Sequence, residues 1–252
     1  MKILVAIKRV PDPGVNLKVK PGGGVALDGV NFVVNPFCEI AIEQALRLRE
    51  KAGGGEIVVL SVGGKEAQQQ LRTALAMGVD RAILVEGADD AIDSEVVARV
   101  LAKIYEQEKP DLVLLGKQTT DYEANQVGQL AAEYLGLAQA TFAYRMEIAA
   151  DLKSAVVQRE SDGGIETVEI QLPAIVTADL RLVPEVRYPS LPGIMKAKKK
   201  PLVEFTLAAL GVSATPKVRI SAVAAPSERK AGVKVASVEE LVNKLKNEAK
   251  VL

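Results

Sequence analysis

Three short segments place polar or glycine residues where the strands of an open α/β sheet would end. Residues 6–9 follow a β-branched run, residues 62–64 follow the apolar stretch EIVVLSV, and residues 116–125 (GKQTTDYEAN) follow DLVLL. Ligands of such sheets bind beyond the carboxyl ends of the strands. We therefore expect these three segments to meet and to form a binding site.

The stretch around Asn125 suits a phosphate group. Gln126, Gly128 and Gln129 would begin a helix there, and a helix amino end presents free N–H groups with a partial positive charge. The sequence contains neither G-x-x-x-x-G-K-[ST] nor G-x-G-x-x-G, so a nucleotide would be held rather than hydrolysed. Every doubly wound fold has such loops, and a purely structural role for them stays open.

The composition excludes several kinds of chemistry. The 252 residues include no histidine and one cysteine, which rules out His-based triads, His metal sites, intrachain disulfides and cysteine-held clusters. The formal net charge is zero, so no basic excess points to nucleic acid. No apolar run approaches the length that spans a bilayer, and no signal peptide is evident. We expect no metal site, no catalytic residue and no membrane insertion.

Apolar runs and helical periodicity alternate over the first two-thirds of the chain. Strands are expected at residues 2–7, 56–62, 81–85 and 111–115, and helices at 35–50, 66–77, 94–109 and 125–135. Asn35 is a candidate cap for the first helix, with Pro36 suiting its first turn. This order predicts a doubly wound, mostly parallel sheet with helices on both faces.

The pattern changes after about residue 142. Residues 146–148, 154–160 and 166–172 should form antiparallel strands, and 173–178 should return to the main sheet. We expect residues 1–180 to form one α/β nucleotide-binding domain that includes a hairpin at 146–172. From residue 181 onward the chain should be irregular, apart from a short amphipathic helix at 238–246.

Two further features have competing interpretations. Cys38 would lie at the start of the first helix, where the dipole lowers thiol pKa values, but we favour a small pocket-lining residue over a reactive thiol. The apolar stretch LPGIM (191–195) precedes the basic run KAKKK (196–200). Such a loop either anchors in a partner's pocket or folds back on its own core, and the lysines either steer a partner or only favour solubility.

Long segments of the chain resemble the electron transfer flavoprotein β-subunit family. The similar segments are AIKRV (6–10), VNPFCEIAIEQALRL (34–48), RTALAMGVDRAILVE (72–86), DLVLLGKQ (111–118), NQVGQ (125–129), LPAIVTADLRL (172–182), RYPSLPGIMKAKKK (187–200) and AGVKV (231–235). The resemblance covers essentially the whole chain. It implies a fold like that of the adenine nucleotide alpha hydrolases and an electron carrier rather than an enzyme.

The resemblance also implies two nucleotides. A structural AMP would contact Ala6, Asn35, Pro36, Phe37, Cys38, Val62, Asp121, Tyr122, Glu123, Ala124, Asn125, Gln126, Val127, Gly128, Gln129, Leu130, Ala131 and Ala132. FAD would lie mostly on an α subunit and approach Phe37. A second family position near its ring, often tyrosine, corresponds here to Pro13.

Partners follow from the same resemblance. Residues 181–252 would carry a recognition loop and an arm that packs on the α subunit of an obligate heterodimer. Leu191 would insert into acyl-CoA dehydrogenases and related flavin dehydrogenases, with an ETF-quinone oxidoreductase as acceptor. The other partner-binding residues would be Glu160, which would pair with an α-subunit arginine, and Ile194, Met195, Lys196, Lys198, Lys199 and Lys200. The expected compartment is the cytoplasm of a bacterium or the mitochondrial matrix of a eukaryote.

Three other functions remain open at this point. In a bifurcating member of the same family a second FAD replaces AMP. A stress or signalling module with a related fold would bind ATP without a flavin partner. A small ligase or hydrolase would use ATP, although the phosphate motifs of such enzymes are missing.

Overall fold

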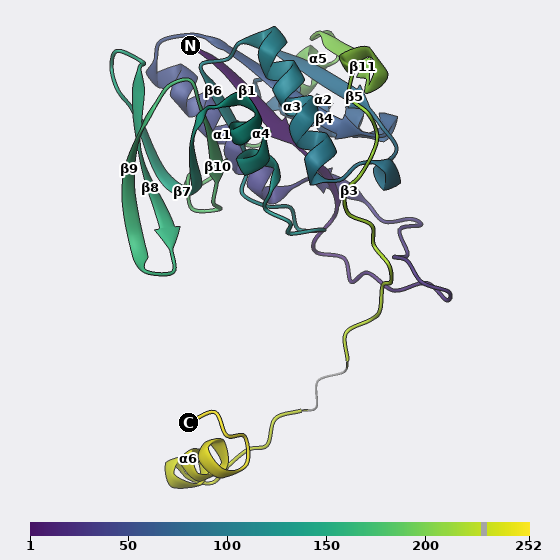
Figure 1. Ribbon diagram of the computed structural model, residues 1–252, viewed down its shortest axis with the longest axis vertical. Helices are drawn as coiled ribbons and strands as arrows, with labels where there is room; N and C mark the ends of the chain where they lie inside the picture. The colour runs from purple at the N-terminus through teal and green to yellow at the C-terminus, as the bar shows by residue number, and fades with distance from the viewer. Residues whose placement is uncertain (228–230) are drawn as a thin grey trace. The chain divides into compact units, whose positions relative to one another are not determined.

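The computed structural model describes residues 1–227 and 231–252, the side chain of Asp90 excepted, and shows a large sheet covered by helices (Figure 1). The residues group into two compact units. One comprises residues 1–17 and 27–220, and the other comprises residues 18–26 and 221–252. The sheet and the candidate site lie in the first unit.

Nine strands form the main sheet in the spatial order β11-β5-β4-β1-β6-β10-β7-β8-β9. Pairing is parallel from β11 to β7 and antiparallel from β7 to β9. The strands are β1 Lys2–Ile7, β4 Glu56–Gly63, β5 Arg81–Glu86, β6 Leu112–Gly116, β7 Ala138–Ile148, β8 Ser154–Ser161, β9 Gly164–Gln171, β10 Ala174–Ala178 and β11 Leu202–Thr206. The predicted fold class is confirmed.

Helices cover both faces of this sheet. They are α1 Pro36–Lys51, α2 Gln68–Met77, α3 Ser94–Glu108 and α4 Val127–Leu135. Helix α5 (Leu191–Ala197) packs on α2, and short 3₁₀ turns form at Lys65–Ala67, Asp89–Ala91 and Ala208–Leu210. One apolar core joins α1 and α2 to one face, and a second joins α3 and α4 to the other. The central strands are buried on both sides, which explains their nearly continuous apolar sequences.

The structure departs from the sequence predictions at four places. Strand β7 begins at Ala138 rather than at residue 146. A small antiparallel pair, β2 Arg9–Pro11 with β3 Phe32–Val34, was not expected. Beyond residue 181 the chain is not irregular throughout, because α5 and β11 form there. Strand β11 pairs with β5 and becomes one edge of the main sheet.

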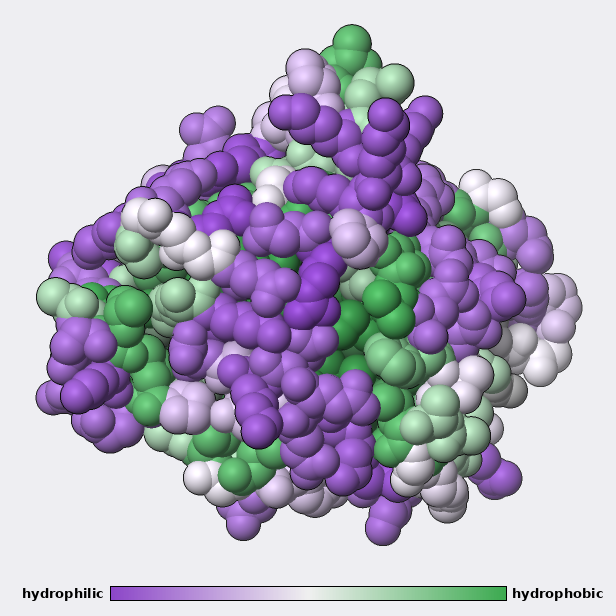
Figure 2. Space-filling view, turned by 90° about the horizontal axis from the view of Figure 1, so that it is seen from above, coloured by the Kyte–Doolittle hydropathy of each residue, from purple (hydrophilic) through white to green (hydrophobic). Residues whose placement is uncertain are grey.

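A charged network joins three strands at their first residues. Arg81 Nε lies 2.6 Å from Glu56 Oε1 and Nη1 lies 2.9 Å from Glu108 Oε1, while Lys2 Nζ lies 2.6 Å from Glu108 Oε2. Figure 2 views the molecule from above Figure 1, where hydrophilic surface surrounds separate hydrophobic patches. The network fastens the end of α3 to the sheet on the side away from the candidate site.

Among the described residues no helix combines the length and the apolar composition needed to traverse a bilayer. In that same part of the chain, no three His, Cys, Asp or Glu side chains gather as metal ligands would.

Candidate functional site

The three predicted loop segments meet at the carboxyl ends of the central strands. Strand β1 lies between β4 and β6, with Ala6 opposite both Leu60 and Leu115. Just beyond, Lys8 Nζ donates to Asp121 Oδ2 at 2.7 Å and joins the first segment to the third. Lys8 belongs to the first predicted segment, residues 6–9, and its place directly after a strand is a signal for such a role.

Asn35 holds the site loops together. Its side chain, which is 0% exposed, donates from Nδ2 to the Gln118 carbonyl at 2.9 Å, and its Oδ1 accepts from Thr120 N–H at 3.2 Å. Its own N–H donates to the Lys8 carbonyl at 2.9 Å. Asn35 is the N-cap residue of α1, as predicted, but its side chain makes no capping hydrogen bond and bonds the loop after β6 instead.

Phe37 lies where α1 approaches β6 most closely. The side chain is almost fully buried, and a Cβ added to Gly116 would lie only 2.6 Å from Phe37 Cβ. Glycine at the end of β6 therefore allows the amino end of α1 to pack on the strand. Lys117 places its ammonium 5.6 Å from the Phe37 ring centroid and 4.9 Å from that of Phe142.

Cys38 is buried beside Asn35. Its Sγ accepts from Asn35 Nδ2 at 3.2 Å. Burial raises the pKa of the thiol, outweighing the hydrogen bonds that would lower it. The helix dipole therefore does not make Cys38 a thiolate, and the structure agrees with a small residue packed against the site.

Helix α4 begins directly after the third segment without a side-chain cap, and the first N–H groups of a helix have no partners within their own helix. Gly128 is required for packing, since an added Cβ would lie 2.7 Å from Thr177 Cγ2 of β10. Gln129 donates from Nε2 to Asn125 Oδ1 at 3.0 Å. Its Oε1 is buried and has no hydrogen-bond partner among the described residues, as is also true of Ser61 Oγ at the end of β4.

These features suit a polar ligand that carries a phosphate group. Unpaired helix N–H groups suit a phosphate, and buried polar atoms without a partner suit the polar edges of a ribose or a base. The remaining predicted contacts lie in the same region: Pro36 begins α1, Val62 lies near the end of β4, Tyr122, Glu123 and Ala124 occupy the loop before α4, and Gln126, Val127, Leu130, Ala131 and Ala132 belong to its first turns.

Glu160 pairs with an arginine of its own chain. Arg181 contacts the Glu160 carboxylate with both terminal nitrogens and reaches Asp179 Oδ1 from Nε at 2.8 Å. Lys117 Nζ lies 2.8 Å from Asp179 Oδ2. Burial would raise the pKa of Asp179, but Arg181 and Lys117 outweigh it and lower the pKa to about 2. The pairing of Glu160 with an α-subunit arginine stays a prediction.

The segment predicted as a recognition loop begins with a helix. Leu191 is 74% exposed and Met195 57%, with Ile194 also exposed on α5. Lys196, Lys198 and Lys199 are exposed, whereas Lys200 is partly buried and donates to main-chain carbonyls. Three lysines of the basic run therefore face solvent, and the fourth, Lys200, bonds to the protein itself.

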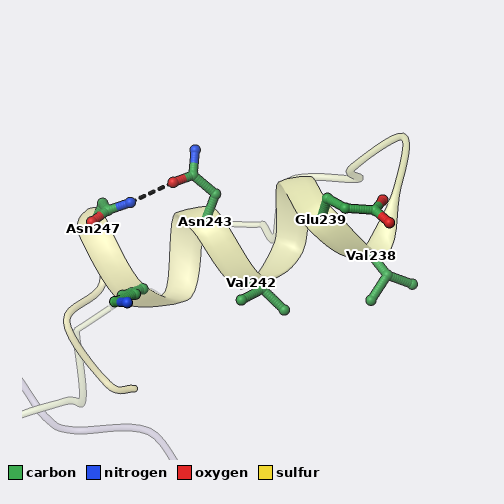
Figure 3. Close-up of a pocket in the computed structure, with 6 residues that line it drawn as sticks. Val238, Glu239, Val242, Asn243 and Asn247 are labelled. Atoms are coloured by element: carbon green, nitrogen blue, oxygen red, sulfur yellow. Dashed lines mark hydrogen bonds between the residues drawn. The ribbon is translucent and has the colours of Figure 1, made fainter.

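Two predicted features lie away from these contacts. Pro13 occupies an exposed turn after β2, and its approach to a flavin stays a prediction. In the second unit, α6 (Val238–Asn247) begins at Ser237, whose hydroxyl accepts from Glu240 N–H. Val238 and Val242 lie on one side of α6 and Asn243 bonds Asn247 on another (Figure 3), with Val238 72% exposed. What this apolar side contacts in the assembled protein stays a prediction.

Comparison with known proteins identifies close relatives. Residues 23–210 match the family model described as the electron transfer flavoprotein domain. The chain is 52% identical to the electron transfer flavoprotein subunit beta of Bradyrhizobium diazoefficiens over the full length of both proteins. It is 50% identical to the human subunit over 98% of this chain and 97% of that protein, and 47% identical to the mitochondrial Arabidopsis thaliana subunit over the full length of both.

Proposed function

Because the chain belongs to the electron transfer flavoprotein β-subunit family, we propose that it forms one half of a two-chain electron carrier. The observation that carries this proposal is similarity at about half of all positions along essentially the full length of the known subunits. An α subunit is the partner that this membership implies. The chain itself would supply a nucleotide-bearing platform and a docking surface, without substrate chemistry of its own.

AMP is the nucleotide we propose for the site beyond β1, β4 and β6. The amino end of α4 would bind its phosphate, and the unpaired Gln129 Oε1 supports a polar ligand there. Asn35 would keep the loop of residues 118–120 in place around it. Held in this way, the nucleotide would stabilise the junction of the three loops.

FAD, which supplies reversible electron storage when bound, would lie between this chain and the α subunit. Phe37 would present an aromatic edge toward it, held in place by Gly116 and accompanied by the Lys117 ammonium. Lys117 is neutralised by Asp179, so the aromatic cluster would add little net charge at that boundary.

Acyl-CoA-type flavin dehydrogenases are the proposed electron donors, and an ETF-quinone oxidoreductase is the proposed acceptor. Leu191 would anchor the donor, and burial of one leucine contributes about 1.5–3 kcal/mol, which suits a transient complex. Lys196, Lys198 and Lys199 would steer an acidic partner surface toward it.

Release of bound nucleotides from the denatured heterodimer tests the site. The expected result is AMP together with one FAD. Two FAD molecules and no AMP would instead identify a bifurcating carrier. A stable single chain that binds ATP and never assembles with a flavin-containing partner would contradict the proposal as a whole.

Substitution of the anchor tests the docking role. The Leu191→Ala heterodimer should keep its FAD and its assembly, because the side chain is mostly exposed. Its reduction by a dehydrogenase should slow about 10-fold or more, as loss of 1.5–3 kcal/mol implies. Steady-state reduction kinetics measure the effect, and unchanged rates would refute the anchor.

A further inference from the structure

Helix α5 is too short to be stable by itself. It has seven residues, of which Pro192 and Gly193 occupy the first turn. Isolated helices of this length do not persist in water. Since the helix exposes Leu191 and Met195 to solvent, these side chains contribute little to holding it in place. Other contacts must fix its position.

Arg72 in the middle of α2 and Lys200, three residues beyond the end of α5, connect the carboxyl-terminal parts of the two helices by hydrogen bonds. Arg72 of α2 donates from Nη1 to the carbonyls of Ala197 and Lys200, at 2.7 and 2.8 Å. In return, Lys200 Nζ donates to the carbonyls of Leu75 and Val79, at 3.0 and 2.5 Å. The last carbonyls of a helix have no partners within it and carry partial negative charge, which favours Arg72 at the Ala197 carbonyl and Lys200 at the Leu75 carbonyl. The second bond of each cation reaches a residue that follows the other helix.

A glycine sets the distance between the same two helices. A Cβ added to Gly193 would lie 2.6 Å from the Ala76 carbonyl oxygen, closer than side-chain carbon atoms approach. Ala197, on the next turn of α5, is buried against the same core as Ala76. Any larger residue at position 193 therefore displaces α5 from α2.

The chain is also fastened before and after α5. Upstream, Arg187 binds Glu43 and Glu50 of α1, with Nε 2.7 Å from Glu43 Oε2 and Nη1 2.6 Å from Glu50 Oε1. Downstream, β11 pairs along β5 of the main sheet. Both ends of the exposed helix are thus attached to rigid elements.

From this geometry we infer that Arg72 and Lys200 are positioning residues that hold α5 in its docking conformation before a partner binds. The inference rests on the proposed function, because it takes the exposed side of α5 as the surface that a dehydrogenase contacts. A preformed surface strengthens binding because no ordering is required on contact. The basic run would then have two roles. Lys196, Lys198 and Lys199 would attract the partner electrostatically, and Lys200 would hold α5 in position.

Two neighbouring lysines allow a matched test in the FAD-containing heterodimer. Lys200→Gln should raise the KM of a dehydrogenase for the carrier about 3- to 10-fold at every ionic strength, with kcat unchanged. Lys199→Gln should raise KM at low salt by less than Lys200→Gln does, and this effect should disappear at high salt, so that KM depends less on ionic strength, since that side chain is exposed. Lys200→Arg, which keeps donors for the two carbonyls, should restore KM to within about twofold of the unsubstituted protein.

Gly193→Ala provides a second test that changes no charge. It should raise KM as Lys200→Gln does, while FAD content and heterodimer assembly stay normal. If Lys200→Gln fails to assemble with the α subunit, the KM of a dehydrogenase for the Gly193→Ala heterodimer tests the inference instead.

Equal salt-dependent effects at Lys199 and Lys200, or an unaltered KM in Gly193→Ala, would overturn the inference. Leu191→Ala, measured in parallel, separates a failure of this inference from a failure of the proposed docking role. If Leu191→Ala also leaves KM unaltered, the docking role itself is wrong. If only the Leu191 variant is impaired, the surface is real but Arg72 and Lys200 do not position it.

Discussion

Asn35 is the residue on which the most site contacts converge. Its residue type and position predict a helix cap, but its side chain bonds two main-chain groups more than eighty residues away along the chain. The local preference of asparagine for helix starts is visible in the sequence. Whether the side chain takes local or distant hydrogen-bond partners is set by the packing of β1 beside β6, which no local sequence pattern shows.

Asn35→Ala should lower both stability and nucleotide retention. The substitution leaves the Gln118 carbonyl and the Thr120 N–H without their buried partner, at a cost of about 1–3 kcal/mol each. The thermal midpoint of the heterodimer should fall, and AMP recovered per FAD should decrease. Both can be measured on the same preparation.

Cys38→Ala is the matched control for that experiment. It removes only the weak sulfur acceptor of Asn35 and leaves the loop contacts in place. A small change in stability and normal nucleotide content are expected. A loss as large as that in Asn35→Ala would show that packing around residue 38, rather than the loop contacts, supports the site.

At the level of elements, long apolar runs and helical periodicity predicted most boundaries within a few residues. The predicted elements were wrong where contact with an element distant in the sequence determines the local conformation. The first half of β7 reads AQATFAYR, which lacks a clear apolar alternation, and it becomes a strand because β10 pairs with it. Pro192 and Gly193 indicate a loop, yet Ser190 caps a helix there and α2 supports it.

Gly128→Ala should displace α4 from the sheet. The added methyl group would lie 2.7 Å from Thr177 Cγ2, so the amino end of α4 must shift. Overpacking of this kind costs about 1–3 kcal/mol, and the shift should reduce AMP content. Thermal midpoint and nucleotide content are the measurements.

A double variant makes that prediction specific. Thr177→Ser removes the clashing methyl group and keeps the hydroxyl that accepts from Phe142 N–H at 3.0 Å. Adding Thr177→Ser to Gly128→Ala should restore most of the thermal stability and AMP content that Gly128→Ala loses. A double variant as impaired as Gly128→Ala alone would mean that the glycine serves some purpose other than packing against β10.

At the level of the whole molecule, the network at the strand starts should make stability depend on pH. The hydrogen bonds from Arg81 lower the pKa of Glu108 to about 2, against the opposing effect of burial, and Lys2 contributes in the same direction. The ordinary pKa of a glutamate is about 4.3 in an unfolded chain. The stabilisation is therefore complete above pH ~4.5 and is lost as the pH falls toward 2.

Glu108→Gln should lower the thermal midpoint at neutral pH, with a loss of about 2–3 kcal/mol, and should flatten the decline between pH 5 and pH 3. Glu147→Gln breaks an ion pair with Arg145 in which both side chains are exposed, and it should leave the dependence of stability on pH unchanged. Parallel profiles for Glu108→Gln and the unsubstituted protein would mean that other carboxylates, such as Asp179, govern acid unfolding.

The main sheet also separates the two proposed partner-contact sites, the exposed side of α5 and Glu160. Helix α5 rests on α2 near β5, while Glu160 lies on β8, and the strand order places five other strands between them. At the usual spacing of about 4.8 Å between neighbouring strands, that is roughly 29 Å across the sheet. Partners bound at α5 and at Glu160 would therefore contact separate parts of the sheet, so a donor would not need to leave α5 before another body contacts β8.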